Sequence, residues 1–415
     1  MRDNQFNSRR WIIISLINFF IVSVVGIILR YKINFPLPLI DQKFLLHGHS
    51  HFAFVGWVSL ALMALMVNYL TRSGIVTNYK KYHCLFIANT ISAYGMLIAF
   101  TAQGYALASI TFSTLSIFVS YFFIFYYWKD LSGIKGNQHT SNWFKFALVL
   151  LGISSIGPFT LAYLMANRIF VQDLYFSAIY FFLHFQYNGW FLFACFGLLF
   201  SFVQQKEDMH LLKINRGLFL ILALTVIPSY LLSILGLKVP AYLFWIAAGS
   251  AIVQLSVVFY NYRLLEALRS RPDFSLNQMT AYLWTLAYIS FALKIVLQSF
   301  SIIPYFADFA FSLRPVIVAY LHLCFLGVIS FFILGCCNIV LARVGRELNK
   351  TGLCIFISGV LLQEGALMVQ ALDAIAFNGV VHTGIVLFLA AVMMAVGLAI
   401  TLIKAGYFIN AKRPL

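Results

Sequence analysis

The sequence predicts an all-α integral membrane protein with twelve transmembrane helices. Hydrophobic residues occupy 62% of the 415 positions and charged residues 10%, which leaves too little polar surface for a soluble globular protein of this size. Apolar runs of about 20 residues, enough to cross the hydrocarbon core of a bilayer as a helix, follow one another with short polar breaks. A histidine-containing phrase also occurs three times, each time in a different apolar run.

Twelve apolar spans can be assigned in order along the chain. They cover residues 11–30, 48–70, 84–104, 108–128, 143–166, 174–203, 217–237, 241–262, 280–300, 315–342, 352–372 and 380–404. The first span is longer than the apolar region of a signal peptide and no small-residue cleavage site follows it, so we expect a retained helix. We therefore expect a multi-pass protein of the inner (cytoplasmic) membrane, with the lipid bilayer as a partner.

The basic residues predict the orientation of the spans, because cytoplasmic loops near membrane ends retain Lys and Arg. With the N-terminus inside, each of the seven inner segments holds three Lys or Arg residues, whereas the outer loops together hold six. Both termini are therefore predicted to be cytoplasmic. The formal net charge of +16 then reflects topology, and we expect no nucleic-acid partner because no soluble domain carries a basic stripe.

The repeated phrase predicts a threefold internal repeat. It reads SHFAFVGW at His51, LHFQYNGW at His184 and LHLCFLGV at His322. A glycine follows each histidine five residues later, and the intervals between the histidines are 133 and 138 residues. Nearly equal intervals are typical of a repeated unit. The pseudo-repeats of a single transmembrane domain (1–415) are expected at about 1–135, 136–270 and 271–415.

Histidines inside hydrocarbon need partners for their ring nitrogens, and a metal is one such partner. In the expected topology His51, His184 and His322 lie at one level toward the outer face. His47 shares a helical face with His51, four residues later, and His382 begins the twelfth span at a similar height. Neutral imidazoles hold haem iron or copper, so these five residues are candidate metal ligands. The alternative is a hydrogen bond from each imidazole to a neighbouring helix.

Two charged residues lie within spans, where charge is costly and usually faces a partner or a water path. Lys294 is in the ninth span, where its side chain can hardly reach the interface, and Glu364 is in the eleventh. Both are candidates for a proton or substrate path. The alternative is a local pair between neighbouring helices.

The twelve spans and the histidines of the second, sixth and tenth spans resemble subunit I of the haem-copper oxidase and nitric oxide reductase superfamily. The resemblance implies three quasi-equivalent four-helix arcs. It also implies that His51 or His49 and His322 bind haem axially, and that His184 binds copper. Arg314, Arg168 or Arg30 would pair with the anionic haem propionates, and Arg314 is best placed, at the outer start of the tenth span. The alternative is an ordinary interfacial arginine. The resemblance covers the whole chain in architecture, but its motifs are confined to these three spans.

The chain departs from this superfamily at the copper site. The superfamily takes two adjacent histidines from the seventh helix, but the corresponding span, 217–237, has none. The sixth span shows His184-Phe185-Gln186-Tyr187 in place of the superfamily's proline and its tyrosine pattern. The usual dioxygen-reducing centre cannot be assembled from these residues, so we expect a divergent haem-binding member.

Two classes of function remain open from the sequence. The first is a haem-dependent oxidoreductase or electron-transfer protein, with copper as a second candidate cofactor, acting on nitric oxide or another diatomic. Because the chain has no CxxCH site, its electron donor would be a separate cytochrome, a quinol or a partner subunit. The second is a non-enzymatic transporter, channel or haem-based sensor on the same twelve-helix frame. The predicted four-helix repeats all have the same orientation in the membrane. This favours the first class, because many transporters use inverted repeats.

Overall fold

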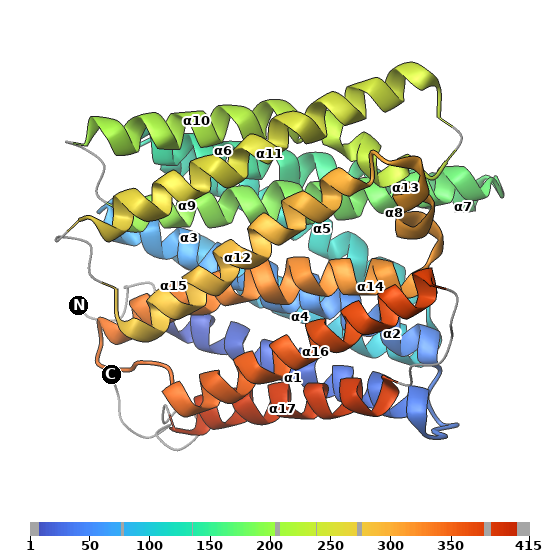
Figure 1. The fold of residues 1–415 in the computed structure, drawn as a ribbon. Coiled ribbons are helices and arrows are strands. Elements are labelled where there is room, and N and C mark those ends of the chain that lie inside the picture. The colour runs from blue at the N-terminus through green and yellow to red at the C-terminus, as the bar shows by residue number, and fades with distance from the viewer. Residues whose placement is uncertain are drawn as a thin grey trace. The chain divides into compact units, whose positions relative to one another are not determined.

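The computed structural model describes residues 8–75, 79–134, 136–203, 208–237, 239–271, 276–376 and 383–404. Every regular element within these ranges is a helix (Figure 1). His382, one of the candidate metal ligands, lies outside the described residues.

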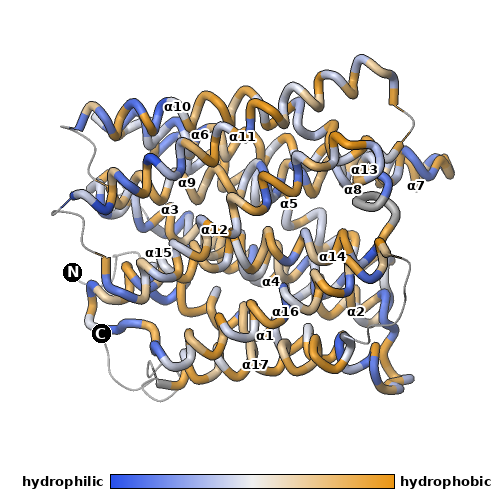
Figure 2. Tube along the Cα trace, viewed as in Figure 1, coloured by the Kyte–Doolittle hydropathy of each residue, from blue (hydrophilic) through white to orange (hydrophobic). Residues whose placement is uncertain are grey.

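The described residues contain eleven helices long and apolar enough to cross a membrane, and a bent pair of helices brings the number to twelve. Each of the twelve predicted spans overlaps one of them, so the prediction of a multi-span all-α membrane protein is confirmed. The first, for example, extends over Ser8–Asn34. Figure 2 shows hydrophobic residues along the helix bodies and hydrophilic residues gathered toward their ends. The three arcs and the cytoplasmic termini stay predictions.

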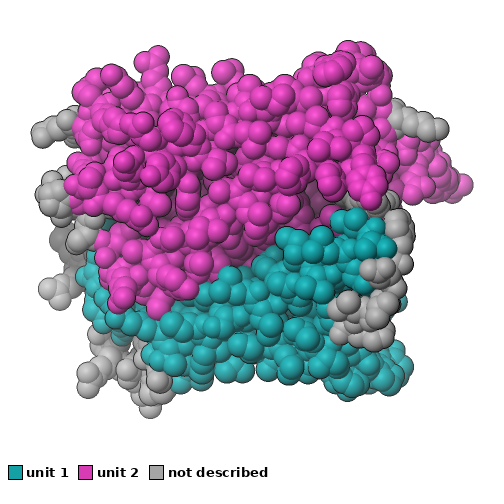
Figure 3. Space-filling view, viewed as in Figure 1, with its two compact units in different colours: residues 1–127, 333–415 teal, residues 128–332 magenta. Residues whose placement is uncertain are grey.

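The helices form two compact units (Figure 3), which are residues 1–127 with 333–415, and residues 128–332. Unit 1 contains α1 (Ser8–Asn34), α2 (Gln42–Phe52), η1 (Ala53–Ser59), α3 (Leu60–Arg72), α4 (Lys80–Gln103), most of α5 (Leu107–Leu131), most of α15 (Phe331–Ala342), α16 (Lys350–Ile375) and α17 (Gly384–Lys404). Unit 2 contains α6 (Gln138–Ser154), α7 (Ile156–Ala166), α8 (Gln172–His184), η2 (Phe185–Phe191), α9 (Leu192–Phe202), α10 (Met209–Thr225), η3 (Pro228–Ile234), α11 (Ala241–Arg269), α12 (Gln278–Phe300), α13 (Pro304–Ser312), α14 (Arg314–His322) and η4 (Leu323–Ser330).

Polar residues outside the apolar runs start several of these helices. Each capping side chain accepts a hydrogen bond from a backbone N–H of the first turn, which otherwise has no partner within the helix. The capping residues are Asp41 before α2, Asp208 before α10, Asn277 before α12 and Asn349 before α16. The helices therefore begin before the apolar runs that the sequence marks as spans.

In unit 1, α16 and α17 approach each other closely because glycines lie at their contact. A Cβ atom on Gly352 would lie 2.6 Å from the carbonyl oxygen of Gly397, and one on Gly359 would lie 2.9 Å from the backbone nitrogen of Met394. Small residues permit this approach, which drives helix association where lipid removes the hydrophobic driving force. α1 packs along α17, and α2 packs against both α1 and α4.

In unit 2, the span formed by α8, η2 and α9 is enclosed by its neighbours, with 83% of its apolar window buried. α6 packs along η2 and α9, and η4 packs against α12. Trp143 of α6 is fully buried, and its indole N–H donates a 2.7 Å hydrogen bond to Oδ1 of Asn215 on α10. The enclosed span is the one that carries His184, so this histidine lies in the interior of the unit.

Candidate functional site

The three copies of the repeated phrase share one local structure. A π-helical segment begins within two residues of each histidine: η1 follows His51, η2 follows His184 and η4 follows His322. π-Helical turns are rare, and they occur frequently at functional sites. The three phrases therefore share a backbone conformation as well as a sequence pattern, whereas the larger pseudo-repeats stay a prediction.

Two asparagines of unit 1 bind carbonyl groups of η1. Asn18 of α1 donates from Nδ2 to the oxygen of Gly56 at 2.7 Å, and Asn89 of α4 donates to the oxygen of Val55 at 3.1 Å. Side-chain donors of this kind satisfy backbone carbonyls that lack an α-helical partner. The π-helical turn is thus held by both neighbouring helices.

His184 has hydrogen-bond partners in unit 2 for both of its ring nitrogens. Its Nε2 lies 2.7 Å from the carbonyl oxygen of Val226, and its Nδ1 lies 3.1 Å from Nδ2 of Asn188. Because a carbonyl only accepts, Nε2 carries the proton and Nδ1 accepts from the Asn188 amide. The side chain is 1% exposed. In this arrangement His184 is a neutral, fully paired imidazole without a free nitrogen for copper.

The carbonyl that binds His184 is available because the seventh span is broken at Pro228. α10 and η3 meet at an angle of 52°, and a proline in this position cannot donate to the preceding turn. Beyond the break the N–H of Tyr230 donates to Ile227 O, three residues back, at 3.2 Å. The oxygen of Val226, which the N–H of Tyr230 would bind in an α-helix, accepts instead from the imidazole and, at 3.1 Å, from the hydroxyl of Ser229.

Lys294 of α12 is buried, with 4% exposure. Its ammonium group donates to Oδ1 of Asn188 and, at 2.6 Å, to Oε1 of Gln298, one turn further along the same helix. Asn188 therefore joins the lysine to His184. The long side chain does not reach an interface, as the sequence indicated, and two amide oxygens replace water around the charge.

The hydrogen bonds continue from Gln298 to the helix that precedes the break. Gln298 donates from Nε2 to Oε1 of Gln254 at 3.2 Å, and Gln254 donates to the hydroxyl of Thr225 at 3.1 Å. The Thr225 hydroxyl in turn donates to Ile221 O at 2.7 Å. Thr225 directly precedes Val226, whose carbonyl accepts the hydrogen bond from His184. These side chains and this stretch of backbone therefore form a closed loop, which we call the polar ring.

All donors in this polar ring point away from Lys294. In one branch Lys294 donates to Asn188, Asn188 donates to His184, and His184 donates to a carbonyl. In the other branch Lys294 donates to Gln298, Gln298 donates to Gln254, and Gln254 donates to a hydroxyl. A cation at Lys294 orients both branches, because each amide turns its oxygen toward the charge. The ring therefore fits a protonated Lys294 and a neutral His184.

His322 differs from His184 in how its ring is held. Its Nδ1 lies 2.8 Å from the carbonyl oxygen of Val318, one turn back on α14, so Nδ1 carries the proton and Nε2 has the lone pair. The side chain is half-buried. Tyr320, two residues earlier, donates its hydroxyl to Oε1 of Gln298 at 3.1 Å, which connects α14 to the polar ring.

Arg314 is the first residue of α14 and is exposed. It precedes His322 by eight residues, which corresponds to about 12 Å along a helix. The arginine thus lies at the end of the helix, as the sequence predicted, two turns from the imidazole.

In unit 1, His47 and His51 lie on one face of α2, toward two aromatic side chains. The ring of His51 stacks on Phe100 at 4.4 Å and 6°, and its Nε2 lies 3.4 Å from the hydroxyl of Tyr105. His47 meets the ring of Tyr105 edge-on at 4.8 Å, and its Nε2 is buried without a hydrogen-bond partner among the described residues. The expected shared face of His47 and His51 is confirmed.

His49 lies on another side of α2, next to Gly26 of α1. A Cβ atom on Gly26 would lie 3.5 Å from Cε1 of His49, so the glycine gives the ring room against the backbone of α1. The three neighbouring histidines are therefore divided between two sides of their helix.

Glu364 lies on α16 in unit 1. Its Oε1 and the Nε2 of the adjacent Gln363 are buried without hydrogen-bond partners among the described residues. Arg30 of α1 is close enough to Glu364 to interact electrostatically. Glu364 thus lies in unit 1 and Lys294 in unit 2.

The described residues contain no group of three or more His, Cys, Asp or Glu side chains that could hold a metal ion. A haem iron needs only one or two imidazoles from the protein, so a search for groups of three side chains tests for copper-type sites and not for haem sites. His382 cannot be assigned to either, because it lies outside the described ranges.

Sequence reasoning did not identify Gln298, Tyr320 or the break at Pro228 as parts of the site. Gln298 follows Lys294 by four residues and so shares its helical face, which is a signal present in the sequence. A proline within a span also predicts a kink. The residues that contact one another in the site come from five different spans, and their contacts have no signature in the sequence.

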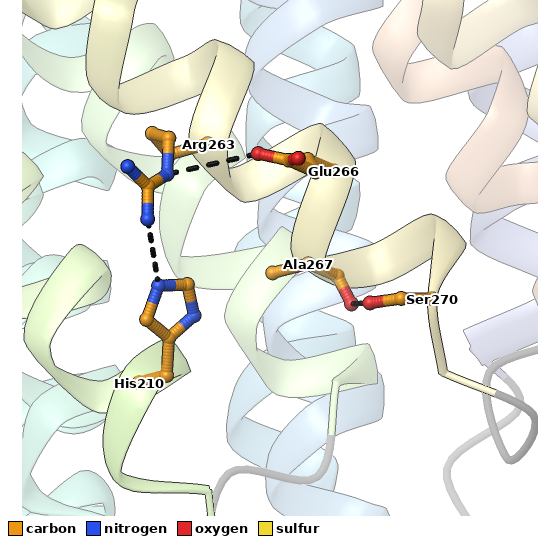
Figure 4. Close-up of polar contacts among 5 residues, drawn as sticks. All are labelled: His210, Arg263, Glu266, Ala267 and Ser270. Atoms are coloured by element: carbon orange, nitrogen blue, oxygen red, sulfur yellow. Dashed lines mark hydrogen bonds and ion pairs between the residues drawn. The ribbon is translucent and has the colours of Figure 1, made fainter.

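A smaller polar cluster lies where α10 and α11 meet at the basic end of unit 2 (Figure 4). Arg263 lies between the ring of His210 (Nη2 to Nε2, 3.2 Å) and the carboxylate of Glu266 (Nε to Oε2, 3.7 Å). All three side chains are solvent-exposed. Such exposed pairs contribute little stability, and the cluster is separate from the buried polar ring.

No protein-family model matches this chain, and a search of curated proteins finds no match.

Proposed function

We propose that the protein is a haem-binding membrane protein with a redox or electron-transfer function, in which the imidazole of His322 would hold the haem iron. The observation that carries the proposal is the hydrogen bond from Nδ1 of His322 to Val318 O at 2.8 Å. This bond fixes the tautomer and the ring orientation, with the proton on Nδ1, which is how ligating imidazoles are usually held.

Within unit 1, we propose His49 rather than His51 as the haem ligand of α2. The ring of His51 is covered by Phe100, and Tyr105 lies at its Nε2. The ring of His49 lies against Gly26, where the absence of a side chain gives the imidazole room beside the backbone of α1. The unpaired, buried Nε2 of His47 indicates a polar partner that the described residues do not supply.

The residues fit haem better than copper. His184 uses both nitrogens within the protein, and the described part of the seventh span offers a backbone carbonyl where the superfamily has histidines. The proposal therefore includes no copper-dependent step. When bound, a haem would supply one-electron chemistry. The contribution of this chain is to bind and orient it, with Arg314 placed two turns above His322 for an anionic propionate.

The test is the visible spectrum and iron content of the purified, full-length protein. We expect a Soret band and reduced-minus-oxidised peaks in the wild type. The His322→Ala variant should lose haem or change its spin state, and His49→Ala should do so more than His51→Ala. His184→Ala should keep its haem, and His139→Ala serves as the control for removing an imidazole elsewhere. A colourless, iron-free wild type from a haem-sufficient host would contradict the proposal.

A second candidate function is proton or ion translocation, which the buried polar ring of Lys294 favours. The ring contains a buried cation held by two amide oxygens, and the amides connect it to two hydroxyls and an imidazole, groups that can pass protons. The test is proton flux in proteoliposomes. Under this proposal Lys294→Met abolishes the flux. The variant Glu364→Gln tests separately whether the carboxyl group in unit 1 takes part. Flux that persists in Lys294→Met would exclude the ring as the path.

The remaining features of this proposal come from the sequence. We propose placement in the inner membrane, an electron donor that is a separate cytochrome, quinol or subunit, and nitric oxide or another diatomic as substrate. The absence of a CxxCH motif supports a separate donor.

A further inference from the structure

A hollow of about 260 Å³ lies at one end of unit 1 and is bordered by three arginines. Arg9 and Arg10 come from the start of α1, and Arg346 comes from the turn that follows α15. Guanidinium groups around one hollow repel one another, and an anion placed between them removes that repulsion. Their planar fork of N–H donors also matches the oxygens of a phosphate.

The turn after α15 holds Arg346 at the hollow. Gly345 has a φ of +70°, a left-handed conformation that favours glycine. The N–H of Gly345 donates to Ala342 O at 2.9 Å, and the N–H of Arg346 donates to Leu341 O at 3.1 Å. These two bonds form a Schellman motif, which ends the helix and turns the chain back. The backbone position of Arg346 is therefore fixed by the fold.

More positive charge lies around this turn. Arg343, within the same turn, is close enough to Arg72 at the end of α3 for the two to interact electrostatically. The distribution of basic residues along the sequence predicts that this end faces the cytoplasm. Anionic lipids are concentrated in that leaflet, and basic pockets between transmembrane helices bind their head groups.

The rest of the hollow is apolar. It is lined by Ile13 and Ile14 of α1 and by Leu341 and Val344 at the end of α15. Ile13 and Ile14 are half-buried, one turn into a helix long and apolar enough to cross the membrane. A free phosphate gains nothing from an apolar wall, whereas the glycerol and acyl groups of a phospholipid bury surface against it.

We propose that this hollow binds an anionic phospholipid. The guanidinium groups of Arg9, Arg10 and Arg346 bind the phosphate oxygens, and the first part of an acyl chain lies along Ile13 and Ile14. The site is independent of the proposed haem function, because none of its residues belongs to that site.

The test uses the full-length protein in detergent, with native mass spectrometry and thermal unfolding as readouts. Phosphatidylglycerol, phosphatidylcholine and inorganic phosphate are added separately. We expect phosphatidylglycerol alone to remain bound and to raise the unfolding temperature. In the variant Arg9→Gln/Arg10→Gln/Arg346→Gln its affinity should fall roughly a hundredfold, since each basic residue near the surface contributes about one kcal/mol.

A matched control removes three positive charges elsewhere. Lys129→Gln/Lys213→Gln/Arg216→Gln changes three exposed basic residues that do not border the hollow, and it should keep the wild-type affinity. Equal loss in both variants would overturn the proposal, because it would show a general charge effect. Equal stabilisation by phosphatidylcholine or by inorganic phosphate would also overturn it.

Arg346→Lys keeps the charge and guards against a failure of the triple variant to fold. We expect severalfold weaker binding of phosphatidylglycerol, because an ammonium group lacks the bidentate fork of a guanidinium. Unchanged affinity in both Arg346→Lys and Arg346→Gln would exclude this residue from the site and contradict the proposal.

Discussion

The Nε2 of His184 donates to the carbonyl oxygen of Val226 at 2.7 Å, which links the sixth span to the break in the seventh. A carbonyl can only accept a hydrogen bond, so Nε2 carries the proton. With the amide of Asn188 at Nδ1, the ring is held in this structure as a neutral imidazole.

Removing the His184 ring should destabilise the protein without removing haem. In His184→Ala the Asn188 amide loses its buried acceptor and the Val226 carbonyl keeps only the Ser229 hydroxyl, so the loss of stability should be about 2–4 kcal/mol. Thermal unfolding in detergent measures this, with His139→Ala as the control. A loss of iron or of a Soret band in His184→Ala, comparable to that in His322→Ala, would show instead that this histidine binds a metal.

Straightening the seventh span should have a similar but smaller effect. In Pro228→Ala the helix can continue, and the N–H of Tyr230 can then bind Val226 O in place of the imidazole. We expect a loss of about 1–3 kcal/mol, because His184 is left with a buried, unpaired N–H. Pro304→Ala, at the start of α13, is the control proline. A more stable Pro228→Ala protein would mean that the bend does not support His184.

Lys294 and Asn188 should be energetically coupled. Asn188→Leu leaves a buried ammonium with one fewer partner and should cost about 3 kcal/mol, whereas Lys294→Met removes the charge and should cost less. The double variant should lose less stability than the sum of the two, by about 1–3 kcal/mol. Additive losses in this double-mutant cycle would show that Asn188 does not stabilise the buried charge of Lys294.

The first turn of α10 should lose stability in acid. Oδ1 of Asp208 accepts hydrogen bonds from the N–H groups of His210 and Leu211, both at 3.0 Å, and these bonds lower the pKa of its carboxyl group. A lowered pKa means that the stabilisation is present above the unfolded-state pKa and is lost as the pH falls through the folded-state value.

Hydrogen exchange of the Leu211 amide as a function of pH measures this dependence on Asp208. Asp208→Ala should raise the exchange rate at neutral pH, since loss of a cap costs about 1 kcal/mol. Asp208→Asn keeps an accepting oxygen without a titratable group, so its exchange should show little of the acid dependence. The same acid dependence in Asp208→Asn would assign the effect to another group.

The size of residue 26 should control the environment of His49. In Gly26→Ala the added Cβ would make an ordinary 3.5 Å contact with Cε1 of His49, so the variant should resemble the wild type. Gly26→Leu should displace the ring and, under the proposed haem function, shift or weaken the Soret band. An unchanged spectrum in Gly26→Leu, together with haem loss in His51→Ala, would favour His51 as the ligand.

The positions of the spanning helices along the chain could be predicted from the sequence because the lipid bilayer imposes a simple rule. Every spanning helix needs an apolar run of sufficient length, so hydropathy alone locates it. The prediction for 174–203, for example, is close to the observed span Gln172–Phe202. The ends differ where capping residues such as Asp208 start a helix ahead of its apolar run.

The role of each histidine was not accessible in the same way. His51, His184 and His322 occur in equivalent phrases, and each is followed by a π-helical segment, yet their ring nitrogens have different partners. Which nitrogen carries the proton depends on whether a carbonyl, amide or hydroxyl of another turn or helix lies beside it.

The sequence by itself determined that this is a helical, multi-span membrane protein with three equivalent histidine phrases, because composition and spacing are properties of the chain. Only the tertiary structure decided that His184 is paired with a carbonyl, that Lys294 is held by two amides, and that His322 donates to a carbonyl of its own helix. Hydrogen bonds form between atoms about 3 Å apart, and the residues that meet at this distance come from separate helices.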